Sequence, residues 1–123
     1  MPKLNAPAGL SFDHVAQQVP DIGAAIDWYR RVVPGCRVLY QDSTWAFIET
    51  AGVRLALIRQ GDHPDHIAWR VSADELERLA AEHRQTVRAH RDGSRGVYLA
   101  APGGHWIEFI SFPAQPAARS DAP

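Results

Sequence analysis

The sequence repeats itself at a constant offset of 52 residues, and this repeat limits the possible fold more than any other feature. The tetrapeptide Asp-His-Val-Ala at 13–16 matches Asp-His-Ile-Ala at 65–68, and a valine follows each at the same distance. Gly52 and Gly104, which each separate two apolar runs, are again 52 residues apart. Three landmarks at one offset predict a duplicated module of about fifty residues.

Both modules are predicted to contain one strand, one helix and three further strands. In the first module, residues 12–19 alternate as a strand does, and residues 22–33 have helical periodicity after Asp21, a good N-cap. In the second, residues 66–71 predict a strand, and Ser72 caps the next helix. The remaining strands are expected near residues 37–42, 45–50, 53–59, 86–91, 96–101 and 105–112. The sequence therefore predicts an α+β fold of two tandem βαβββ modules.

We expect one folded domain at residues 10–112, with module one at 10–60 and module two at 65–112. With 46% hydrophobic and 22% charged residues, the chain has an ordinary composition for a protein with one core. Residues 1–9 and 113–123 lack a hydrophobic period and contain several prolines, so they are predicted to be an N-terminal and a C-terminal tail.

Charge and cysteine content exclude several classes of function. The formal net charge of -1 at pH 7 gives no reason to expect nucleic acid or an anionic membrane as a partner. The single cysteine, Cys36, rules out an internal disulfide and a multi-cysteine zinc site, and its place in a turn predicts a structural thiol. The N-terminus lacks a secretory signal and no segment approaches the roughly 20 apolar residues of a membrane span, so a cytoplasmic location is expected.

Two histidines take matching positions in the repeat. Side chains alternate across a strand, so His14 is expected to share a strand face with Phe12 and Ala16, and His66 occupies the corresponding face in module two. A single histidine on a strand is more often a hydrogen-bonded core residue than a metal ligand. Its repetition at equivalent positions favours two ligands brought together by pseudo-symmetry.

A carboxylate on the last predicted strand completes the candidate set. Glu108 shares a strand face with Trp106 and Ile110, and a carboxylate among apolar groups is costly unless it is paired or bound to a cation. Two histidines and one carboxylate are the set that holds Fe(II), Mn(II) or a similar ion with positions left open. Trp106 is expected to form part of the substrate-binding wall.

The other histidines are interpreted as surface residues. His63 and His105 each precede a proposed ligand by three residues, which places them on the opposite strand face. His83 falls on a polar helix face. For His90 an approach to the cavity stays open, and the surface role is preferred.

Four further polar residues lie near the proposed ligands. Tyr98, on the strand beside the last one, is expected to face the cavity as a proton donor or hydrogen-bond partner, with an ordinary structural role as the alternative. Arg70 shares the face of the second histidine and is a candidate for binding an anionic substrate group, with a surface position as the alternative. Asp13 and Asp65 are expected to be polar residues at strand edges and not ligands.

These features together resemble the vicinal oxygen chelate superfamily, which includes glyoxalase I, methylmalonyl-CoA epimerase, extradiol dioxygenases and the fosfomycin- and bleomycin-resistance proteins. The resemblance rests on paired βαβββ modules, a histidine on the first strand of each, and Gly-Gly-His-x-x-Glu at 103–108. It covers about residues 10–112. It implies a half-barrel cup from each module, with one divalent metal held between the cups by His14, His66 and Glu108. It also implies a homodimer, because in many two-module members the cups come from different subunits.

The sequence departs from two of these proteins at one position. Glyoxalase I and the epimerase resemble this chain but use a fourth protein ligand, Glu or Gln, on the last strand of module one. The repeat places that ligand at Ala56, and neither Leu55 nor Leu57 can replace it. Glu49 lies on the preceding predicted strand and is a poor substitute. A three-ligand site, as in extradiol dioxygenases and fosfomycin-modifying enzymes, therefore fits better.

The resemblance implies a metal-dependent enzyme that acts on a small oxygenated substrate chelated through adjacent oxygens. Fe(II) or Mn(II) is favoured, with Ni(II), Co(II) or Zn(II) as alternatives, and dioxygenase-like chemistry is slightly favoured. The alternatives are a glyoxalase-type lyase or isomerase, a thiol or water transferase of the fosfomycin type, and a metal-free drug-binding protein. Tyr98 and Arg88 match the fosfomycin group, whereas Ala117 stands where that group has a further arginine. Retention of the three ligands argues against metal-free binding.

Overall fold

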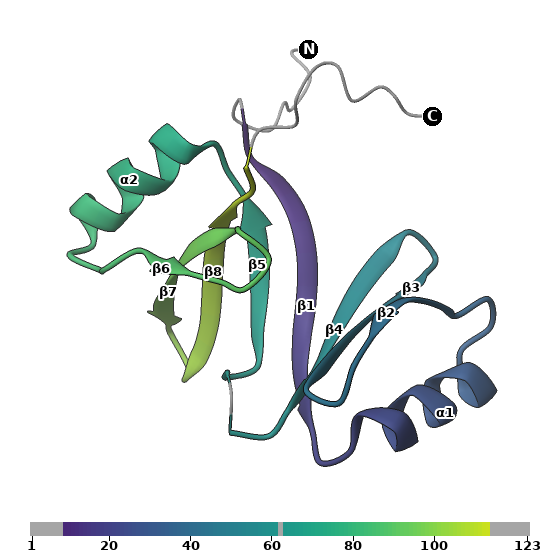
Figure 1. Cartoon of the computed structure of the whole chain (residues 1–123). Helices are drawn as coiled ribbons and strands as arrows, with labels where there is room; N and C mark the ends of the chain where they lie inside the picture. The colour runs from purple at the N-terminus through teal and green to yellow at the C-terminus, as the bar shows by residue number, and fades with distance from the viewer. Residues whose placement is uncertain (1–8, 62, 114–123) are drawn as a thin grey trace, which may run out of the picture.

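The computed structural model describes residues 9–61 and 63–113 of the chain (Figure 1). The elements follow the order strand, helix, three strands, and then the same order again. They are β1 (Ser11–Val19), α1 (Ile22–Val32), β2 (Arg37–Gln41), β3 (Trp45–Thr50), β4 (Val53–Arg59), β5 (His66–Arg70), α2 (Ala73–Glu82), β6 (Arg88–Ala89), β7 (Arg95–Ala101) and β8 (His105–Ser111). The predicted α+β fold of two tandem βαβββ modules is confirmed.

All of these strands belong to one mixed sheet with the order β2-β3-β4-β1-β5-β8-β7-β6. In each module the first strand pairs in parallel with the last, β1 with β4 and β5 with β8. The two modules meet where β1 pairs antiparallel with β5. β1 therefore runs through the middle of the molecule in Figure 1, with one module on either side of it. The two halves form one open sheet whose edges are β2 and β6.

Both helices cover the same face of this sheet. In module one, Ile22 and Ile26 of α1 pack against Ala46, Ile48 and Leu57. In module two, α2 and the sheet form a second cluster, which contains Val71, Leu76, Ala80 and Val97. Each fully buried Leu or Ile contributes about 1.5–3 kcal/mol, so these clusters hold the helices to the sheet. Because side chains alternate along a strand, the residues between the core positions point to the opposite, uncovered face.

Both helices begin at the predicted caps. The Asp21 carboxylate accepts a hydrogen bond of 2.8 Å from the Ala24 N–H, and the Ser72 hydroxyl accepts one of 3.1 Å from the Glu75 N–H. The first helix ends at Val32, one residue earlier than predicted. The reason is Pro34, which disfavours a helical backbone at the residue before it, and Val33 is extended with φ -106 and ψ 114.

The strand predicted at residues 86–91 is much shorter in the structure. β6 has only Arg88 and Ala89, and a tight turn follows directly. In this turn the His90 N–H donates to the Ser94 carbonyl, and the Gly93 N–H donates to the His90 carbonyl. The turn therefore contains residues that the alternation pattern assigned to a strand.

The first strand contains a bulge that the sequence pattern did not predict. Phe12 pairs with Trp69 and His14 pairs with Ala68, so Asp13 is an additional residue between two adjacent pairs. Phe12 consequently lies on the opposite face from His14, and the expectation that the two share a face is wrong. Alternation cannot detect such a residue, because the bulge shifts the period by one.

The predicted tails at 1–9 and 113–123 fall almost entirely outside the described residues, which begin at Gly9 and end at Pro113. Neither helix in the described part of the chain has the length and apolar character needed to cross a lipid bilayer.

Candidate metal centre

His14, His66 and Glu108 come together on the sheet face that the helices leave uncovered. They lie on β1, β5 and β8, three adjacent strands at the centre of the sheet. Ala68 pairs with His14 on one side and with Glu108 on the other, which aligns the three strands in register. All three side chains are buried, and each offers a ligand atom within 4.8 Å of the other two. The complete set comes from one chain.

The spacing of these atoms fits a single metal ion. The Nε2 atom of His66 lies 3.2 Å from Oε1 of Glu108, and Nε2 of His14 lies 4.0 Å from the same oxygen. Metal–ligand bonds of about 2.1 Å place neighbouring donor atoms about 3–4 Å apart. Both pairs fall in this range, so the donor set fits a divalent ion with positions left open.

Each histidine is oriented through its other ring nitrogen. The Nδ1–H of His66 donates to the Pro64 carbonyl at 2.7 Å, and the Nδ1–H of His14 donates to the Asp13 carboxylate at 2.7 Å. With Nδ1 protonated, the Nε2 lone pair of both rings is available to a metal. Such outer partners fix the tautomer and ring orientation of metal-ligating histidines.

Asp13 is buried behind His14, which corrects the expectation of a polar residue at a strand edge. Its Oδ1 atom accepts hydrogen bonds from Arg54 at 2.8 Å and from the Nε atom of Arg70 at 3.2 Å. Burial alone raises the pKa of Asp13, but the hydrogen bond from His14 and the positive charges of the two arginines lower it below its usual range. The bulge in β1 accounts for the difference. Asp65, by contrast, accepts a hydrogen bond from the backbone N–H of Gln18 and is not a ligand.

Arg70 contacts the site through Asp13. Its guanidinium group binds the Asp13 carboxylate and lies over the ring of Phe112, 4.1 Å from the ring centre. The side chain is about half exposed, at 47%. The structure therefore separates Arg70 from His14 by one residue, Asp13.

His90 contacts a candidate ligand, which the preferred sequence interpretation missed. Its Nε2–H donates to Oε2 of Glu108 at 2.8 Å, and its side chain is only 20% exposed. Burial raises the pKa of Glu108, but the interactions with the imidazoles of His66 and His90 outweigh it and lower this pKa to about 2. The hydrogen bond to Glu108 in turn raises the pKa of His90. Only the register of the hairpin β6–β7 could have revealed this contact. His63, His83 and His105 are exposed as predicted. The prediction that His63 lies on the opposite strand face is wrong, because His63 precedes β5 and its ring lies beside Tyr98.

Tyr98 lies beside the candidate ligands. It pairs with Glu108 across β7 and β8, and its ring meets the ring of His66 edge to face with centres 5.1 Å apart. Its hydroxyl lies 3.2 Å from Nδ1 of His63. Burial and the negative charge of Glu108 raise the pKa of Tyr98, so the phenol keeps its proton and remains a hydrogen-bond donor.

Trp106 stands at the edge of this face. It is 40% exposed, pairs with His66 across the sheet, and lies two residues before Glu108 on β8. In module one, Phe47 occupies the place of Tyr98, because it pairs with Ala56 and contacts His14 edge to face at 5.5 Å. One side of the site is thus apolar and the other carries hydrogen-bonding groups.

The position of a fourth ligand is filled by an apolar side chain. Ala56 is buried in a cluster with Ala16, Ile58 and Phe47. Glu49, the poor substitute, forms an ion pair with Arg37. Among the described residues, the candidate centre therefore has three protein ligands.

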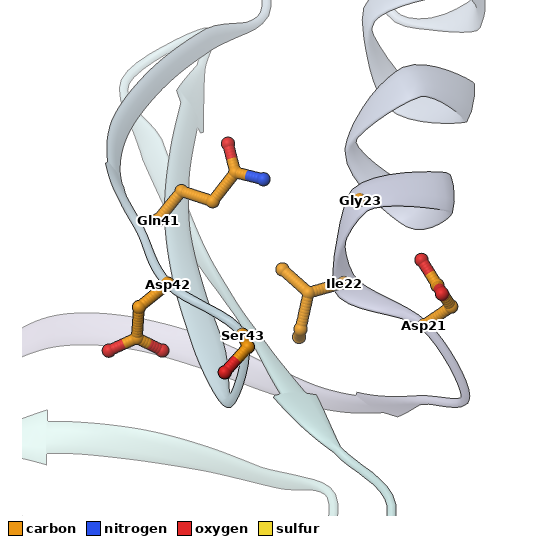
Figure 2. Close-up of a pocket in the computed structure, with 6 residues that line it drawn as sticks. All are labelled: Asp21, Ile22, Gly23, Gln41, Asp42 and Ser43. Atoms are coloured by element: carbon orange, nitrogen blue, oxygen red, sulfur yellow. The ribbon is translucent and has the colours of Figure 1, made fainter.

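A separate pocket lies between the start of α1 and the β2–β3 turn, and Figure 2 shows its lining. Its two carboxylates already hold local structure, since Asp21 caps α1 and Asp42 accepts hydrogen bonds from Thr44 and Trp45. Asp42 points away from the helix in Figure 2. None of the predicted site residues lines this pocket.

The sequence profile of the Glyoxalase/Bleomycin resistance protein/Dioxygenase superfamily matches residues 11–109. The chain belongs to this superfamily. The resemblance drawn from the repeat and the Gly-Gly-His-x-x-Glu segment is thereby confirmed. No curated protein sequence matches this superfamily member significantly.

Solved structures of other superfamily proteins share the fold. Methylmalonyl-CoA epimerase from Mycobacterium tuberculosis is 22% identical with a TM-score of 0.67, and the match covers 96% of this chain and 97% of that one. A variant of homoprotocatechuate 2,3-dioxygenase from Brevibacterium fuscum is 19% identical, with a TM-score of 0.64 over 92% of this chain and 35% of that one. The Mn(II)-bound glyoxalase from Novosphingobium aromaticivorans is 20% identical, with a TM-score of 0.58 over 81% of this chain and 37% of that one.

Proposed function

We propose that this superfamily member is a divalent-metal-dependent enzyme in which His14, His66 and Glu108 hold one Fe(II) or Mn(II) ion. Its substrate is a small oxygenated molecule that chelates the ion, and dioxygenase-like chemistry is favoured over the alternatives. The observation that carries the proposal is the convergence of three buried donor atoms, with Nδ1 of both histidines already engaged. A buried carboxylate between two imidazoles is the donor chemistry that such an ion requires.

The number of ligands supports this choice of reaction. With Ala56 at the fourth position, the protein supplies three ligands, and two or three positions remain for substrate oxygens. When bound there, a divalent ion polarises and orients adjacent oxygens of a substrate. One structural neighbour is a variant of homoprotocatechuate 2,3-dioxygenase, and another is a Mn(II)-bound glyoxalase.

The surrounding side chains are proposed to bind and orient the substrate. Tyr98 is the candidate hydrogen-bond donor because its hydroxyl stays protonated and its ring lies against His66. Trp106, exposed at the edge of the site, supplies an apolar wall. Arg70 is proposed to attract anionic substrates, while its direct contact is with Asp13.

An isomerase of the epimerase or glyoxalase type is the second candidate. The observation in its favour is that this chain matches almost the full length of methylmalonyl-CoA epimerase, 97% of that protein, but only about a third of the dioxygenase. The lack of a carboxylate or amide side chain at Ala56 argues against an isomerase.

The test is the metal content of tag-free protein purified without oxygen, compared with the variants His66→Ala and His105→Ala. About one iron or manganese per chain is expected in the wild type and in His105→Ala, because His105 is exposed on the opposite face of β8, and none in His66→Ala. Nickel or zinc in the wild type would favour the isomerase. Wild-type protein that takes up no metal, even after reconstitution, would overturn the proposal.

We further propose that residues 10–112 form the single domain that carries this activity, and that the protein is a homodimer. The dimer is proposed from the resemblance to two-module members that pair their cups between subunits. Because the candidate ligands come together within one chain, each subunit of this dimer would hold its own complete set. Sedimentation equilibrium of the metal-loaded protein tests the dimer, and a monomer at micromolar concentration would contradict it.

A further inference from the structure

We propose that His90 is a positioning residue that makes Glu108 present a single carboxylate oxygen to the metal. This inference rests on the proposed metal centre and deepens it, because it assigns a role to a side chain outside the three ligands. It predicts that the coordination mode of Glu108, and not only its presence, is set by the turn between β6 and β7.

The two oxygens of Glu108 have different surroundings. Oε1 faces both histidines, 3.2 Å from Nε2 of His66 and 4.0 Å from Nε2 of His14. Oε2 is turned to the other side and accepts the 2.8 Å hydrogen bond from Nε2 of His90. A carboxylate that binds a metal through both oxygens needs both on the metal side. His90 holds one of them away.

The backbone of β7 allows this orientation through Gly96. A Cβ atom at this position would overlap Oε2 of Glu108 and lie 3.2 Å from its carboxyl carbon and 3.1 Å from the Phe109 carbonyl oxygen. The backbone φ of Gly96 is not positive, so the backbone conformation does not require glycine here. A side chain is excluded because there is no space for its Cβ atom. The carboxyl group occupies that space.

His90 is itself held by a tight turn. Its backbone N–H donates to the Ser94 carbonyl at 2.8 Å, and its carbonyl accepts from the Gly93 N–H at 3.1 Å. The Asp92 carboxylate accepts hydrogen bonds from both the N–H and the hydroxyl of Ser94, at 2.9 and 2.6 Å. Ser94 is buried, at 1% exposure. The imidazole therefore approaches Oε2 from a fixed backbone, as a preorganised outer partner must.

A single-oxygen Glu108 has a chemical consequence. Each protein oxygen that stays off the ion leaves one more position for substrate oxygens. Without His90, the Glu108 carboxylate is free to turn and to offer both oxygens, which would occupy a position that a chelating substrate needs. A merely structural role for His90 would alter the stability of the protein and leave the coordination of the ion unchanged.

The experiment is titration of metal-free protein with Co(II), with the visible spectrum and the Kd as readouts. His90→Ala is expected to raise the Kd about 10-fold, the effect typical of losing an outer partner, and to change the Co(II) absorption bands. His90→Gln, whose amide N–H reaches about as far as Nε2, is expected to keep both near wild type. His90→Asn carries the same amide on a shorter side chain and is expected to behave like His90→Ala. His105→Ala is the control on the exposed face of β8 and is expected to change neither.

The outcomes separate this inference from the proposed function. Wild-type binding with an unchanged spectrum and Kd in His90→Ala would overturn the role of His90 and leave the metal centre intact. Folded wild-type protein that binds no Co(II) would overturn the metal centre and this inference together. If His90→Ala does not fold, the comparison of His90→Gln with His90→Asn tests the inference instead. Equal spectra and Kd values for these two variants would also overturn it.

Discussion

Ala56 and Glu108 occupy equivalent positions in the two modules. Ala56 on β4 pairs with Ala16 of β1, and Glu108 on β8 pairs with Ala68 of β5, so each lies beside the first strand of its own module at the 52-residue offset. Both side chains are buried, at 4% and 2% exposure. The duplicated fold therefore carries a carboxylate in one module and a methyl group in the other, and this difference makes the candidate centre a three-ligand site.

Ala56→Glu should add the missing ligand. In the metal-free protein a second buried carboxylate is expected to cost several kcal/mol of stability, because it lacks a partner. Added Mn(II) should restore this stability, and the rise in Tm on metal addition should exceed that of the wild type. Thermal unfolding with and without Mn(II) measures both effects. Ala56→Gln is the neutral control, and Ala56→Glu as stable as the wild type without metal would contradict the assignment.

Asp13→Ala should loosen His14 and the two arginines together. Metal affinity is expected to fall 10- to 100-fold, as it does when a histidine ligand loses its outer partner. Stability should fall by about 3 kcal/mol, because Asp13 is the buried member of ion pairs with Arg54 and Arg70. Calorimetric titration with Mn(II) and urea unfolding are the measurements. Arg70→Ala should lower the stability and the metal affinity much less than Asp13→Ala, since Arg54 still pairs with the carboxylate. Equal losses of stability and affinity in Arg70→Ala and Asp13→Ala would contradict this account.

Gly96→Ala should disturb the carboxyl group of Glu108. The added methyl would overlap Oε2, so we expect a loss of about 1–3 kcal/mol of stability together with weaker metal binding. The control is Gly23→Ala in α1, where the nearest atom to an added Cβ lies 3.6 Å away, at Oδ1 of Asp21. That change should stabilise the helix by up to about 1 kcal/mol. Urea unfolding of both variants tests the pair, and a neutral Gly96→Ala would refute the close approach.

The metal-free protein should lose stability in acid through Glu108. The pKa of Glu108 lies at about 2 in the folded state, below its ordinary value of 4.5. Its contribution is therefore fully present above pH 4.5 and is lost as the pH falls from 4.5 to about 2. The pKa of His90 is raised instead, so its contribution is present below its ordinary value of 6.5 and is lost as the pH rises through the folded-state pKa.

Urea unfolding of metal-free protein as a function of pH measures these contributions. Glu108→Gln should flatten the acid limb of the stability curve, because the amide does not titrate. An identical pH dependence in the wild type and in Glu108→Gln would contradict this prediction, because it would show that folding does not shift the pKa of Glu108.

The module plan and the residues that carry it were predictable from local patterns in the chain. Periods of 2 and 3.6 are local properties of strands and helices, so the order of elements and the caps Asp21 and Ser72 followed from the chain without knowledge of any distant contact. The repeat then identified His14 and His66 as equivalent, and alternation identified Glu108 as a carboxylate on an otherwise apolar face. The structure brings these three together.

The contacts that hold the candidate ligands in place were not predictable from local patterns. Asp13 reaches His14 and both arginines because one additional residue in β1 shifts its side chain to the buried side, and a bulge leaves no periodic signal. His90 reaches Glu108 because a tight turn ends β6 after two residues and because Gly96 leaves room for the carboxyl group. Both contacts depend on register between strands distant in sequence, which local patterns do not specify.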